Sequence, residues 1–333
     1  MTISVGINGF GRIGRAFLRA VLASKADDIR IVAINDTAPA ETMAHLLEFD
    51  SLHGRLPAPV MLTDGGISIG AQTARLTQQH RPEELSWAEV DIALECSGQF
   101  LTPDDAARHF ENGASRVLLS APPQGDIKTC VYGVNHTSVT GADRILSNAS
   151  CTTNCLVPVA KILHDACGIE AGMMTTVHSY TSTQNTHDGP HADLYRARAA
   201  GLSMIPTSTG AAISLGAVMP ELAGRITGHA IRVPTPNVSC IDLVVHLARR
   251  VDAEDINACF ADASKGAFSG IIDTTDRKLV SADFRQDQHS AIIACDQTRV
   301  QGNMARILAW YDNEWGFSNR LIDVVRVMAK ASG

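Results

Sequence analysis

A cysteine stands at the point where an apolar helical pattern begins, in the segment SNASCTTNCLVPVAKIL that starts at Ser147. Polar residues lead up to Cys151, and the apolar run follows it. We therefore predict that Cys151 lies at a helix N-terminus, where unpaired backbone N–H groups and the helix dipole favour negative charge. A thiol in such a place can ionise near neutral pH and act as a nucleophile. A structural cysteine is expected inside the apolar run instead.

The other cysteines do not form a recognisable metal-binding pattern. The chain has eight cysteines and no metal-type CxxC pair, so we predict no metal site. Several lie in apolar runs, which in a reducing compartment is typical of small buried hydrophobic residues. Cys151 and Cys155 would share one face of a helix, but the geometry suits a disulfide poorly, so we predict none there.

A second chemical pattern, Gly9-x-Gly11-x-x-Gly14, follows an apolar run and opens a helical pattern. Alone it often marks only a tight turn, but here Asp36 ends the next strand-like run at the expected spacing. The glycines let the backbone approach a pyrophosphate at the helix N-terminus. The Asp36 carboxylate can accept from both ribose hydroxyls and repels a 2′-phosphate, which favours NAD over NADP.

Two domains are needed to position these groups, because 333 residues exceed what one core usually holds. Strands and helices alternate over residues 1–150, which predicts an α/β, Rossmann-type, doubly wound parallel sheet as the dinucleotide-binding domain. Strand patterns over 151–314 are longer and alternate, which predicts an α+β catalytic domain with a mostly antiparallel sheet. We expect an amphipathic helix at about 315–333 to pack back on the first domain.

Bulk properties exclude some classes of partner. The net charge of −7 argues against a nucleic-acid or anionic-membrane partner. No apolar run reaches the roughly 18 residues needed to span a bilayer. The N-terminal residues do not read as a signal peptide, so we expect a cytoplasmic protein.

Seven motifs, spread over nearly the whole chain, carry a family resemblance: INGFGRIGR, HLLEFDSLHG, ASCTTNC, HSYT, RARAAGLSMIPTSTGAA, RVPTPNVS and WYDNEWGFSNR. With them the chain resembles the bacterial, type I phosphorylating glyceraldehyde-3-phosphate dehydrogenases. The resemblance implies an NAD-dependent enzyme of glycolysis and gluconeogenesis. Such an enzyme converts D-glyceraldehyde 3-phosphate to 1,3-bisphosphoglycerate through a cysteine thiohemiacetal and an acyl thioester.

The resemblance also implies roles for individual residues. Cys151 is similar to the nucleophile and His178 to its partner, whose imidazolium would stabilise the thiolate and whose imidazole would take the hydroxyl proton as hydride leaves. Matches to the substrate-phosphate site are Thr181 and Arg232. Matches to the inorganic-phosphate site are Ser150, Thr152, Arg196, Thr209 and Gly210. The predicted cofactor-binding residues are Gly9, Gly11, Arg12, Ile13, Gly14, Asp36, Ser120 and Asn313, the last holding the nicotinamide carboxamide.

Some positions depart from the family pattern. Thr183 stands where an acidic residue is usual, and Ile213 where a lysine is usual, so substrate or phosphate handling can differ. Phe317 replaces a frequent tyrosine. Thr37 and Gly189 resemble the smaller residues of members that accept NADP. We therefore rank NAD first and use of both cofactors second.

Two other functions stay open at this point. One is an erythrose-4-phosphate dehydrogenase, although that relative usually lacks the HSYT and PTSTG forms present here. The other is a catalytically weak paralogue that acts as a redox-sensing or binding protein, which a reactive cysteine would also suit. In either case the resemblance implies a homotetramer, in which the segment 180–202 lies across a subunit interface.

Overall fold

The computed structural model describes residues 2–331, which form two compact units. The first holds the chain up to Cys130, Asn135–Ala149 and the chain from Ser318 onward; the second holds Val131–Val134 and Ser150–Phe317. Most of the C-terminal helix α7 (Trp315–Lys330) thus belongs to the first unit. Within that unit, Arg326 of α7 makes a two-pronged ion pair with Asp28, with N–O distances of 2.7 and 2.8 Å.

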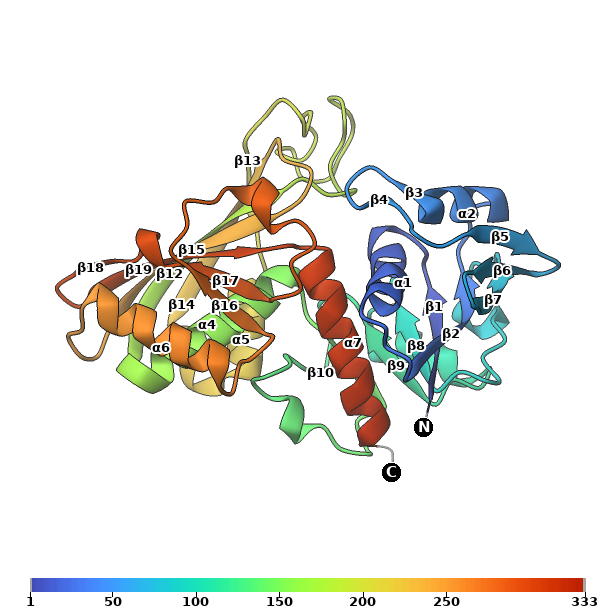
Figure 1. Ribbon diagram of the computed structural model, residues 1–333, viewed down its shortest axis with the longest axis horizontal. Helices are drawn as coiled ribbons and strands as arrows, with labels where there is room; N and C mark the ends of the chain where they lie inside the picture. Colours follow the sequence, from blue (N-terminus) through green and yellow to red (C-terminus); the bar gives the residue numbers. More distant parts are fainter. Residues whose placement is uncertain (1, 332–333) are drawn as a thin grey trace. The chain divides into compact units, whose positions relative to one another are not determined.

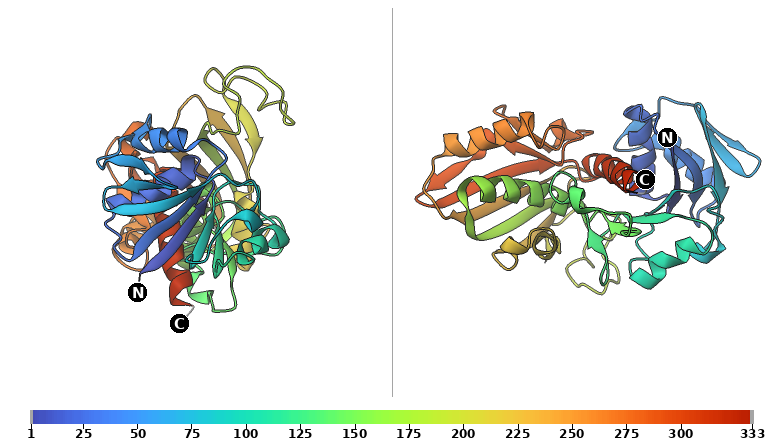
Figure 2. Two further views of the ribbon diagram at one scale, coloured as in Figure 1. Left: turned by 90° about the vertical axis from the view of Figure 1, so that its right-hand side faces the viewer. Right: turned by 90° about the horizontal axis from the view of Figure 1, so that it is seen from below.

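The first unit is built on a parallel sheet, as predicted. Within the described residues its strand order is β10-β11-β9-β8-β1-β2-β7-β6-β5, and only the β5–β6 and β6–β7 pairs are antiparallel. The blue strands of this sheet lie side by side in the left view of Figure 2. The strands are β1 (Ile3–Asn8), β2 (Ile29–Asn35), β5 (Val60–Thr63), β6 (Gly66–Ile69), β7 (Gln72–Thr77), β8 (Ile92–Glu95), β9 (Arg116–Leu119), β10 (Lys128–Thr129) and β11 (Ile145–Ser147).

Three α-helices connect these strands: α1 (Arg12–Ala23), α2 (Ala40–Glu48) and α3 (Pro103–Ala107). A small separate hairpin pairs β3 (Phe49–Asp50) with β4 (Gly54–Arg55). The helix predicted to open at the glycine pattern is α1. The glycine pattern therefore lies between β1 and α1, at the carboxyl edge of the parallel sheet, where dinucleotides bind in this fold class.

The second unit is built on a mostly antiparallel sheet, also as predicted (Figure 1). Its order is β13-β14-β12-β15-β19-β17-β16, with β18 paired to β19; only the β12–β14 and β16–β17 pairs are parallel. The strands are β12 (Ile169–Ser179), β13 (Ile205–Ser208), β14 (Ile226–Val233), β15 (Ser239–Leu247), β16 (Ile272–Thr275), β17 (Ala291–Ala294), β18 (Arg299–Gln301) and β19 (Met304–Tyr311). Its α-helices are α4 (Cys151–Cys167), α5 (Ala211–Val218) and α6 (Ala253–Lys265).

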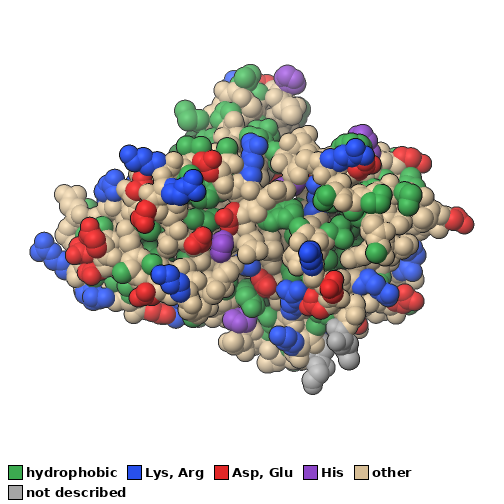
Figure 3. Space-filling model, viewed as in Figure 1, with side chains coloured by type: hydrophobic (Ala, Val, Ile, Leu, Met, Phe, Trp, Pro, Cys, Tyr) green, Lys and Arg blue, Asp and Glu red, His purple; other side chains and the backbone are tan. Residues whose placement is uncertain are grey.

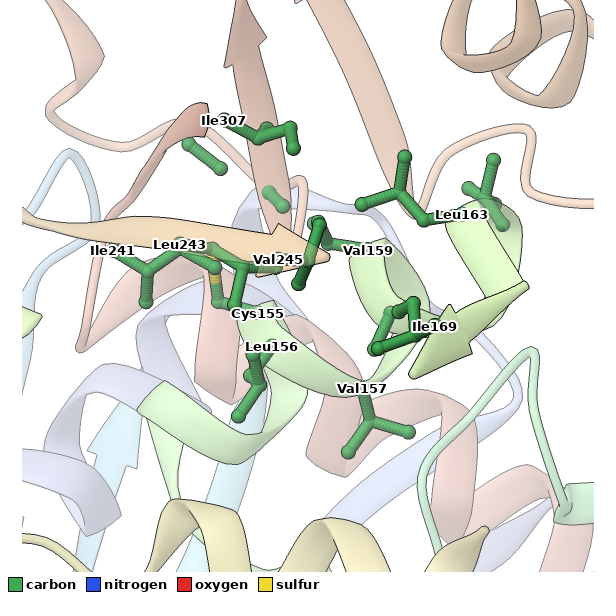
Figure 4. Close-up of a cluster of buried hydrophobic side chains, with 14 of the residues drawn as sticks. Cys155, Leu156, Val157, Val159, Leu163, Ile169, Ile241, Leu243, Val245 and Ile307 are labelled. Carbon is green, nitrogen blue, oxygen red and sulfur yellow. The ribbon is translucent and has the colours of Figure 1, made fainter. Parts of the chain in front are cut away.

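Helix α4 packs its apolar side chains on one face of this sheet (Figure 4). Cys155 is fully buried there, in the same apolar cluster as Leu243 and Val245 of β15. It therefore serves as a small hydrophobic residue, as predicted for most of the cysteines. Because α4 is anchored by this core, its first residue is held in a fixed place above the sheet.

The opposite face of the same sheet carries exposed apolar side chains. Met173 of β12 and Val244 of β15 are cross-strand partners and are 73% and 40% exposed. Their chain neighbours Met174 and Leu243 are buried against the helices. This alternation is what a sheet with one helix-covered face requires.

Charged side chains of both signs are interspersed on the surface that Figure 3 shows, without a large area of one sign. None of the helices within the described residues combines the length and hydropathy needed to cross a membrane.

Candidate active site

Cys151 is the first residue of α4, as the sequence pattern predicts. Ser150 caps the helix: its backbone is extended, and its Oγ accepts the N–H of Thr153 at 3.1 Å. The preceding residue, Ala149, is fully buried with a φ of +56°, in the left-handed region that costs a non-glycine residue energy. This tight turn begins the helix immediately after the loop that follows β11.

The structure brings Cys151 and His178 together. His178 lies near the end of β12, is 4% exposed, and places its Nε2 atom 3.4 Å from the Cys151 sulfur. The two residues are 27 positions apart in the chain. The contact is within the sulfur hydrogen-bond range, so proton exchange between thiol and imidazole is geometrically possible.

Arg232 contacts the other ring nitrogen of His178. In the parallel pairing of β12 and β14 these two residues are direct partners. The Arg232 Nη1 atom lies 2.6 Å from Nδ1 of His178 and 2.8 Å from the carbonyl oxygen of Ser179. Nδ1 also lies 2.7 Å from the carbonyl oxygen of Ser179, which can only accept, whereas the guanidinium can only donate. Nδ1 therefore accepts from Arg232 when the ring proton is on Nε2, and donates to Ser179 when the proton is on Nδ1. We assign the proton to Nε2, facing the sulfur, because the bond from the charged guanidinium is the stronger of the two.

The charges at this pair differ from the sequence-based expectation. Burial raises the pKa of the Cys151 thiol, while the charge of Arg232 and the hydroxyl and N–H of Thr152 act in the opposite direction. Burial and the nearby Arg232 lower the pKa of His178 to about 3, so its imidazole is neutral rather than the imidazolium we expected. The positive charge that favours a thiolate therefore comes from Arg232, together with the backbone N–H groups at the start of α4.

Tyr311, at the end of β19, is a functional candidate that sequence reasoning missed. It is fully buried, and its ring meets the His178 ring edge-on at a centroid distance of 6.0 Å. Its hydroxyl oxygen lies 2.9 Å from Oγ1 of Thr152, which is itself buried. The sequence feature that could have pointed to Tyr311 is its position at the end of an apolar strand, directly before the polar DNE turn.

The residues predicted to bind anions lie on several elements of the second unit. Burial lowers the pKa of Arg232, and the charge of Arg196 lowers it further, while Asp193 lies 3.6 Å from Nε of Arg196. Arg196 donates from Nε to Oγ1 of Thr207 on β13, at 2.9 Å. Two neighbouring guanidinium groups repel each other, and a bound anion between or beside them relieves that repulsion.

Hydroxyl and backbone groups complete this set. Thr181 Oγ1 lies 3.0 Å from Oγ1 of Thr183, the position that departs from the family pattern. Gly210 is the N-cap of α5 and has open space where a Cβ would lie, and Thr209 precedes it. Thr209 Oγ1 accepts the Ala211 N–H at 3.3 Å, and the N-cap Gly210 has no side chain that could bond the other N–H groups at the start of α5.

Asn313 is buried in the turn after β19. Its amide oxygen accepts from the hydroxyls of Ser179 and Ser239, at 2.9 and 3.1 Å. These two contacts fix the amide orientation and leave the NH₂ group as the end that can bind a ligand carbonyl.

The glycine turn of the first unit fits a dinucleotide. A Cβ on Gly9, which has a φ of +91°, would lie 2.4 Å from the Ser97 nitrogen, and one on Gly14 would lie 2.4 Å from the Gly9 oxygen. Gly11 has open space beside it and caps α1 without any side chain. Backbone can therefore approach a pyrophosphate here, as the fingerprint requires.

Other predicted cofactor residues lie along the same carboxyl edge. Asp36 follows β2 and accepts the N–H groups of Phe10 and Ala38, at 2.7 and 2.9 Å, which fixes its carboxylate. Ser120 follows β9, and its N–H bonds the Glu95 carbonyl at the end of β8 at 3.0 Å.

Arg12 and Ile13 form the first turn of α1. Arg12 is paired with Asp50 at 2.5 Å. The Asp50 carboxylate therefore holds the Arg12 guanidinium at the start of α1, near the predicted pyrophosphate position. Among residues 2–331, no group of three or more His, Cys, Asp or Glu side chains is arranged to hold a metal ion.

Comparison with known proteins places both units in one family. The family described as "Glyceraldehyde 3-phosphate dehydrogenase, NAD binding domain" matches residues 3–103, and "Glyceraldehyde 3-phosphate dehydrogenase, C-terminal domain" matches residues 150–313. Proteins named glyceraldehyde-3-phosphate dehydrogenase are similar over 99% of this chain. Those from Cereibacter sphaeroides and Xanthobacter flavus are 56% and 53% identical, each over 99% of its own length, and that from Mycobacterium leprae is 48% identical over 100% of its length.

Proposed function

The chain belongs to the glyceraldehyde-3-phosphate dehydrogenase family, and on that premise we propose that Cys151 and His178 are its catalytic nucleophile and acid–base. The protein is an NAD-dependent oxidoreductase that acts on D-glyceraldehyde 3-phosphate, a reaction of glycolysis. The observation that carries the catalytic assignment is the 3.4 Å contact between the Cys151 sulfur and His178 Nε2 at the start of α4.

Binding of the substrate phosphate prepares Cys151 and His178 for the reaction by changing the hydrogen bonds of the His178 ring. We place the substrate phosphate at Thr181 and Arg232, because Arg232 offers a planar fork of donors in a partly buried setting. When a phosphate draws Arg232 away from His178, Nδ1 can carry a proton and donate it to the Ser179 oxygen, 2.7 Å away. The lone pair of Nε2 then faces the sulfur, so His178 can act as a base.

The first chemical step forms a carbon–sulfur bond. Nε2 of His178 takes the thiol proton, the Cys151 thiolate attacks the aldehyde carbon, and the same nitrogen returns the proton to the carbonyl oxygen to give a thiohemiacetal. The N–H of Cys151 at the start of α4 and the His178 ring are the donors for the oxyanion.

The second step oxidises this intermediate. His178 Nε2 takes the hydroxyl proton, and NAD held by the glycine turn and Asn313 would accept the hydride from the same carbon. The product is an acyl thioester on Cys151. The NH₂ group of Asn313 is placed to hold the nicotinamide carboxamide, since its amide oxygen is engaged by Ser179 and Ser239.

Inorganic phosphate completes the cycle. An oxygen of the phosphate attacks the thioester carbon, the carbon–sulfur bond breaks, and 1,3-bisphosphoglycerate leaves while the thiolate is restored. We place this phosphate at Ser150, Thr152, Arg196, Thr209 and Gly210. The start of α5, where Gly210 offers no side-chain cap, and the charge of Arg196 near Arg232 support that site. Thr152 is the second residue of α4, next to Cys151, and its hydroxyl contacts Tyr311.

The test is a steady-state assay with glyceraldehyde 3-phosphate and NAD, with and without inorganic phosphate. We expect NADH formation that depends on phosphate. Turnover to a free acid without phosphate would indicate an erythrose-4-phosphate type of reaction instead. No NADH formation either with or without inorganic phosphate would indicate a redox-sensing or binding protein.

We also propose that the protein is a cytoplasmic homotetramer with glyceraldehyde 3-phosphate and inorganic phosphate as partners. Exposed apolar side chains support the assembly: Leu194, Leu202 and Ile213 are each more than 80% exposed, and Met173 is 73% exposed on the uncovered sheet face. A molar mass by light scattering equal to one chain would contradict this proposal.

A further inference from the structure

Glu95 is a fully buried carboxyl group that the proposed chemistry does not use. It ends β8, which lies next to β1 in the sheet of the first unit. The order of the parallel strands reverses at this pair, so a dinucleotide is expected in the crevice at their carboxyl ends. We propose that Glu95 is a positioning residue for the cofactor, because its carboxylate holds the turn 97–99 against Gly9. The inference rests on the proposed cofactor position at the glycine turn.

Four hydrogen-bond donors converge on the Glu95 carboxylate. Its Oε1 atom accepts the backbone N–H of Ser97 at 2.7 Å and also the Ser97 hydroxyl. Its Oε2 atom lies 2.6 Å from Nδ2 of Asn8 and 3.1 Å from Nε2 of His109. An ionised carboxylate has about four acceptor positions, so these donors fill all of them.

The ring proton of His109 is fixed by Trp87 on its other side. The indole Nε1 of Trp87 can only donate, and it lies 3.0 Å from Nδ1 of His109. Nδ1 is therefore the acceptor, and the proton is on Nε2, facing Glu95. Both rings are buried, so this donor reaches the carboxylate from a fixed place.

The amide of Asn8 is oriented by a second series of contacts. The backbone N–H of Gln79 donates to Oδ1 of Asn35 at 2.8 Å, which identifies the other end of that amide as the donor. Nδ2 of Asn35 donates to Oδ1 of Asn8 at 2.8 Å, so Nδ2 of Asn8 must face Glu95. Asn8 and Asn35 are the last residues of β1 and β2, and the carboxylate is thus tied to both strands.

This complete pairing fixes the position of Ser97. If Ser97 moved away, the buried carboxylate would lose two of its donors, which is costly at such a site. A Cβ on Gly9 would lie 2.4 Å from the Ser97 nitrogen, so the two turns are in close contact. Gly98 is exposed, with a φ of +72° and open space where a Cβ would lie. The turn 97–99 therefore offers bare backbone beside the glycine turn, where a ligand can approach closely.

A purely structural role for Glu95 is the competing explanation, because the same contacts join β8 to β1 and β2. The two explanations differ in what they change. Loss of folded enzyme lowers the apparent kcat but leaves the KM of every substrate unchanged. A displaced turn weakens the binding of the cofactor and leaves the KM for the aldehyde unchanged.

The first experiment uses Glu95→Gln, which keeps the shape of the side chain but replaces one acceptor oxygen by an NH₂ group. In the protein without cofactor, amide hydrogen exchange at Ser97 should become faster, because its N–H loses a fixed acceptor. The dissociation constant for NAD, measured by calorimetry, should rise about 5- to 30-fold, the effect of one unmade buried hydrogen bond. The KM for NAD should rise with it, while the KM for glyceraldehyde 3-phosphate should not.

Asp91→Asn is the matched control. Asp91 directly precedes β8 and accepts the Ser4 N–H of β1 at 2.8 Å, so it joins the same two strands at their opposite end. This variant should leave both the hydrogen exchange at Ser97 and the dissociation constant for NAD unchanged. An equal effect of the two variants would mean that any loss of contact between the strands weakens NAD binding, and it would overturn the proposal.

Two variants of His109 keep the proposal falsifiable if Glu95→Gln does not fold. His109→Leu removes the donor to Oε2 and should weaken NAD binding, whereas His109→Gln offers an NH₂ donor in its place and should restore most of it. Equal dissociation constants for these two variants would overturn the proposal. So would an unchanged constant in Glu95→Gln, or an equal rise in its two KM values.

Gly11→Asp tests the cofactor position separately. It places a carboxylate in the open space at the start of α1, where it should repel a pyrophosphate. Normal NAD binding by Gly11→Asp would overturn the proposed cofactor position and the inference with it. Loss of binding in Gly11→Asp together with normal binding in Glu95→Gln would overturn the inference alone.

Discussion

Arg232 and His178 are direct cross-strand partners, and the guanidinium lies 2.6 Å from the ring nitrogen that faces away from the nucleophile. One residue therefore has two consequences. It lowers the pKa of His178 while it rests on the ring, and it favours a thiolate at Cys151 by its charge. A substrate phosphate that binds Arg232 therefore changes both the pKa of His178 and the stability of the Cys151 thiolate.

The first prediction concerns Arg232→Ala. The KM for glyceraldehyde 3-phosphate should rise roughly 10- to 150-fold, because a charge-assisted phosphate contact is worth about 1.5–3 kcal/mol. The KM for unphosphorylated glyceraldehyde should change far less. Equal effects on the two aldehydes would place Arg232 in the structure of the site rather than in recognition.

The same variant should change the titration of His178. Without the guanidinium, one of the two causes that lower the pKa of His178 is removed, so that pKa should rise. NMR titration of the His178 ring in the Arg232→Ala protein measures this directly. A pKa that stays the same or falls would show that burial alone controls the ring.

The second prediction is that Cys151 is the most reactive of the eight cysteines. It combines the start of a helix with contact to an imidazole and a nearby guanidinium, whereas Cys155 is fully buried and its pKa is raised well above the usual value. Burial also raises the pKa of Cys295. One equivalent of iodoacetamide at neutral pH should label Cys151 and abolish activity, as peptide mapping can show. Label spread evenly over Cys151, Cys155 and Cys295 would contradict this.

The third prediction concerns stability in acid. Asp50 pairs with Arg12 and accepts the N–H groups of Leu52 and His53, and these contacts lower its pKa to about 2 although burial opposes them. A carboxyl with a lowered folded-state pKa stabilises the protein above its unfolded pKa of about 4 and loses that contribution as pH falls toward 2.

Asp50→Asn should therefore reduce the free energy of unfolding at pH 7 by on the order of 2 kcal/mol. The difference from the unmutated protein should shrink between about pH 4 and 2. Urea unfolding at several pH values measures it, and Asp64→Asn, at an exposed turn, is the control. A difference that does not depend on pH would mean that the carboxylate charge is not the cause.

The sequence predicted the parts of the site that depend on neighbouring residues. Cys151 could be placed at a helix start because the beginning of an apolar helical period is a local signal. The contact between His178 and Arg232 could not be predicted, because it depends on parallel pairing of strands 54 residues apart. The Tyr311 contact with Thr152 spans 159 residues.

The protonation states of Cys151 and His178 could not be predicted from the sequence either. The helix start and the paired histidine were visible in the sequence, but the burial of both groups was not. Burial is the largest cause of the shift in the pKa of both Cys151 and His178, and its direction opposes ionisation of both. Burial therefore opposes the expected ion pair of thiolate and imidazolium, while the structure places the two side chains in contact, 3.4 Å apart.

The last prediction concerns the choice between NAD and NADP. The Asp36 carboxylate is fixed by two backbone N–H groups, so it cannot turn away from a ribose bound at the end of β2. Its repulsion of a 2′-phosphate at about 4 Å could reach a few kcal/mol in a partly solvated site. Thr37 is exposed beside it and adds a hydroxyl donor, and Gly189 lacks the bulk that many NAD-type relatives carry.

We expect kcat/KM with NAD to exceed that with NADP, with NADP turnover still measurable. Asp36→Ala should narrow the gap, chiefly by improving NADP, whereas Asp64→Ala should not. A preference of the unmutated protein for NADP would show that Asp36 was weighted too strongly, and undetectable NADP turnover would show that Thr37 and Gly189 do not relieve the repulsion.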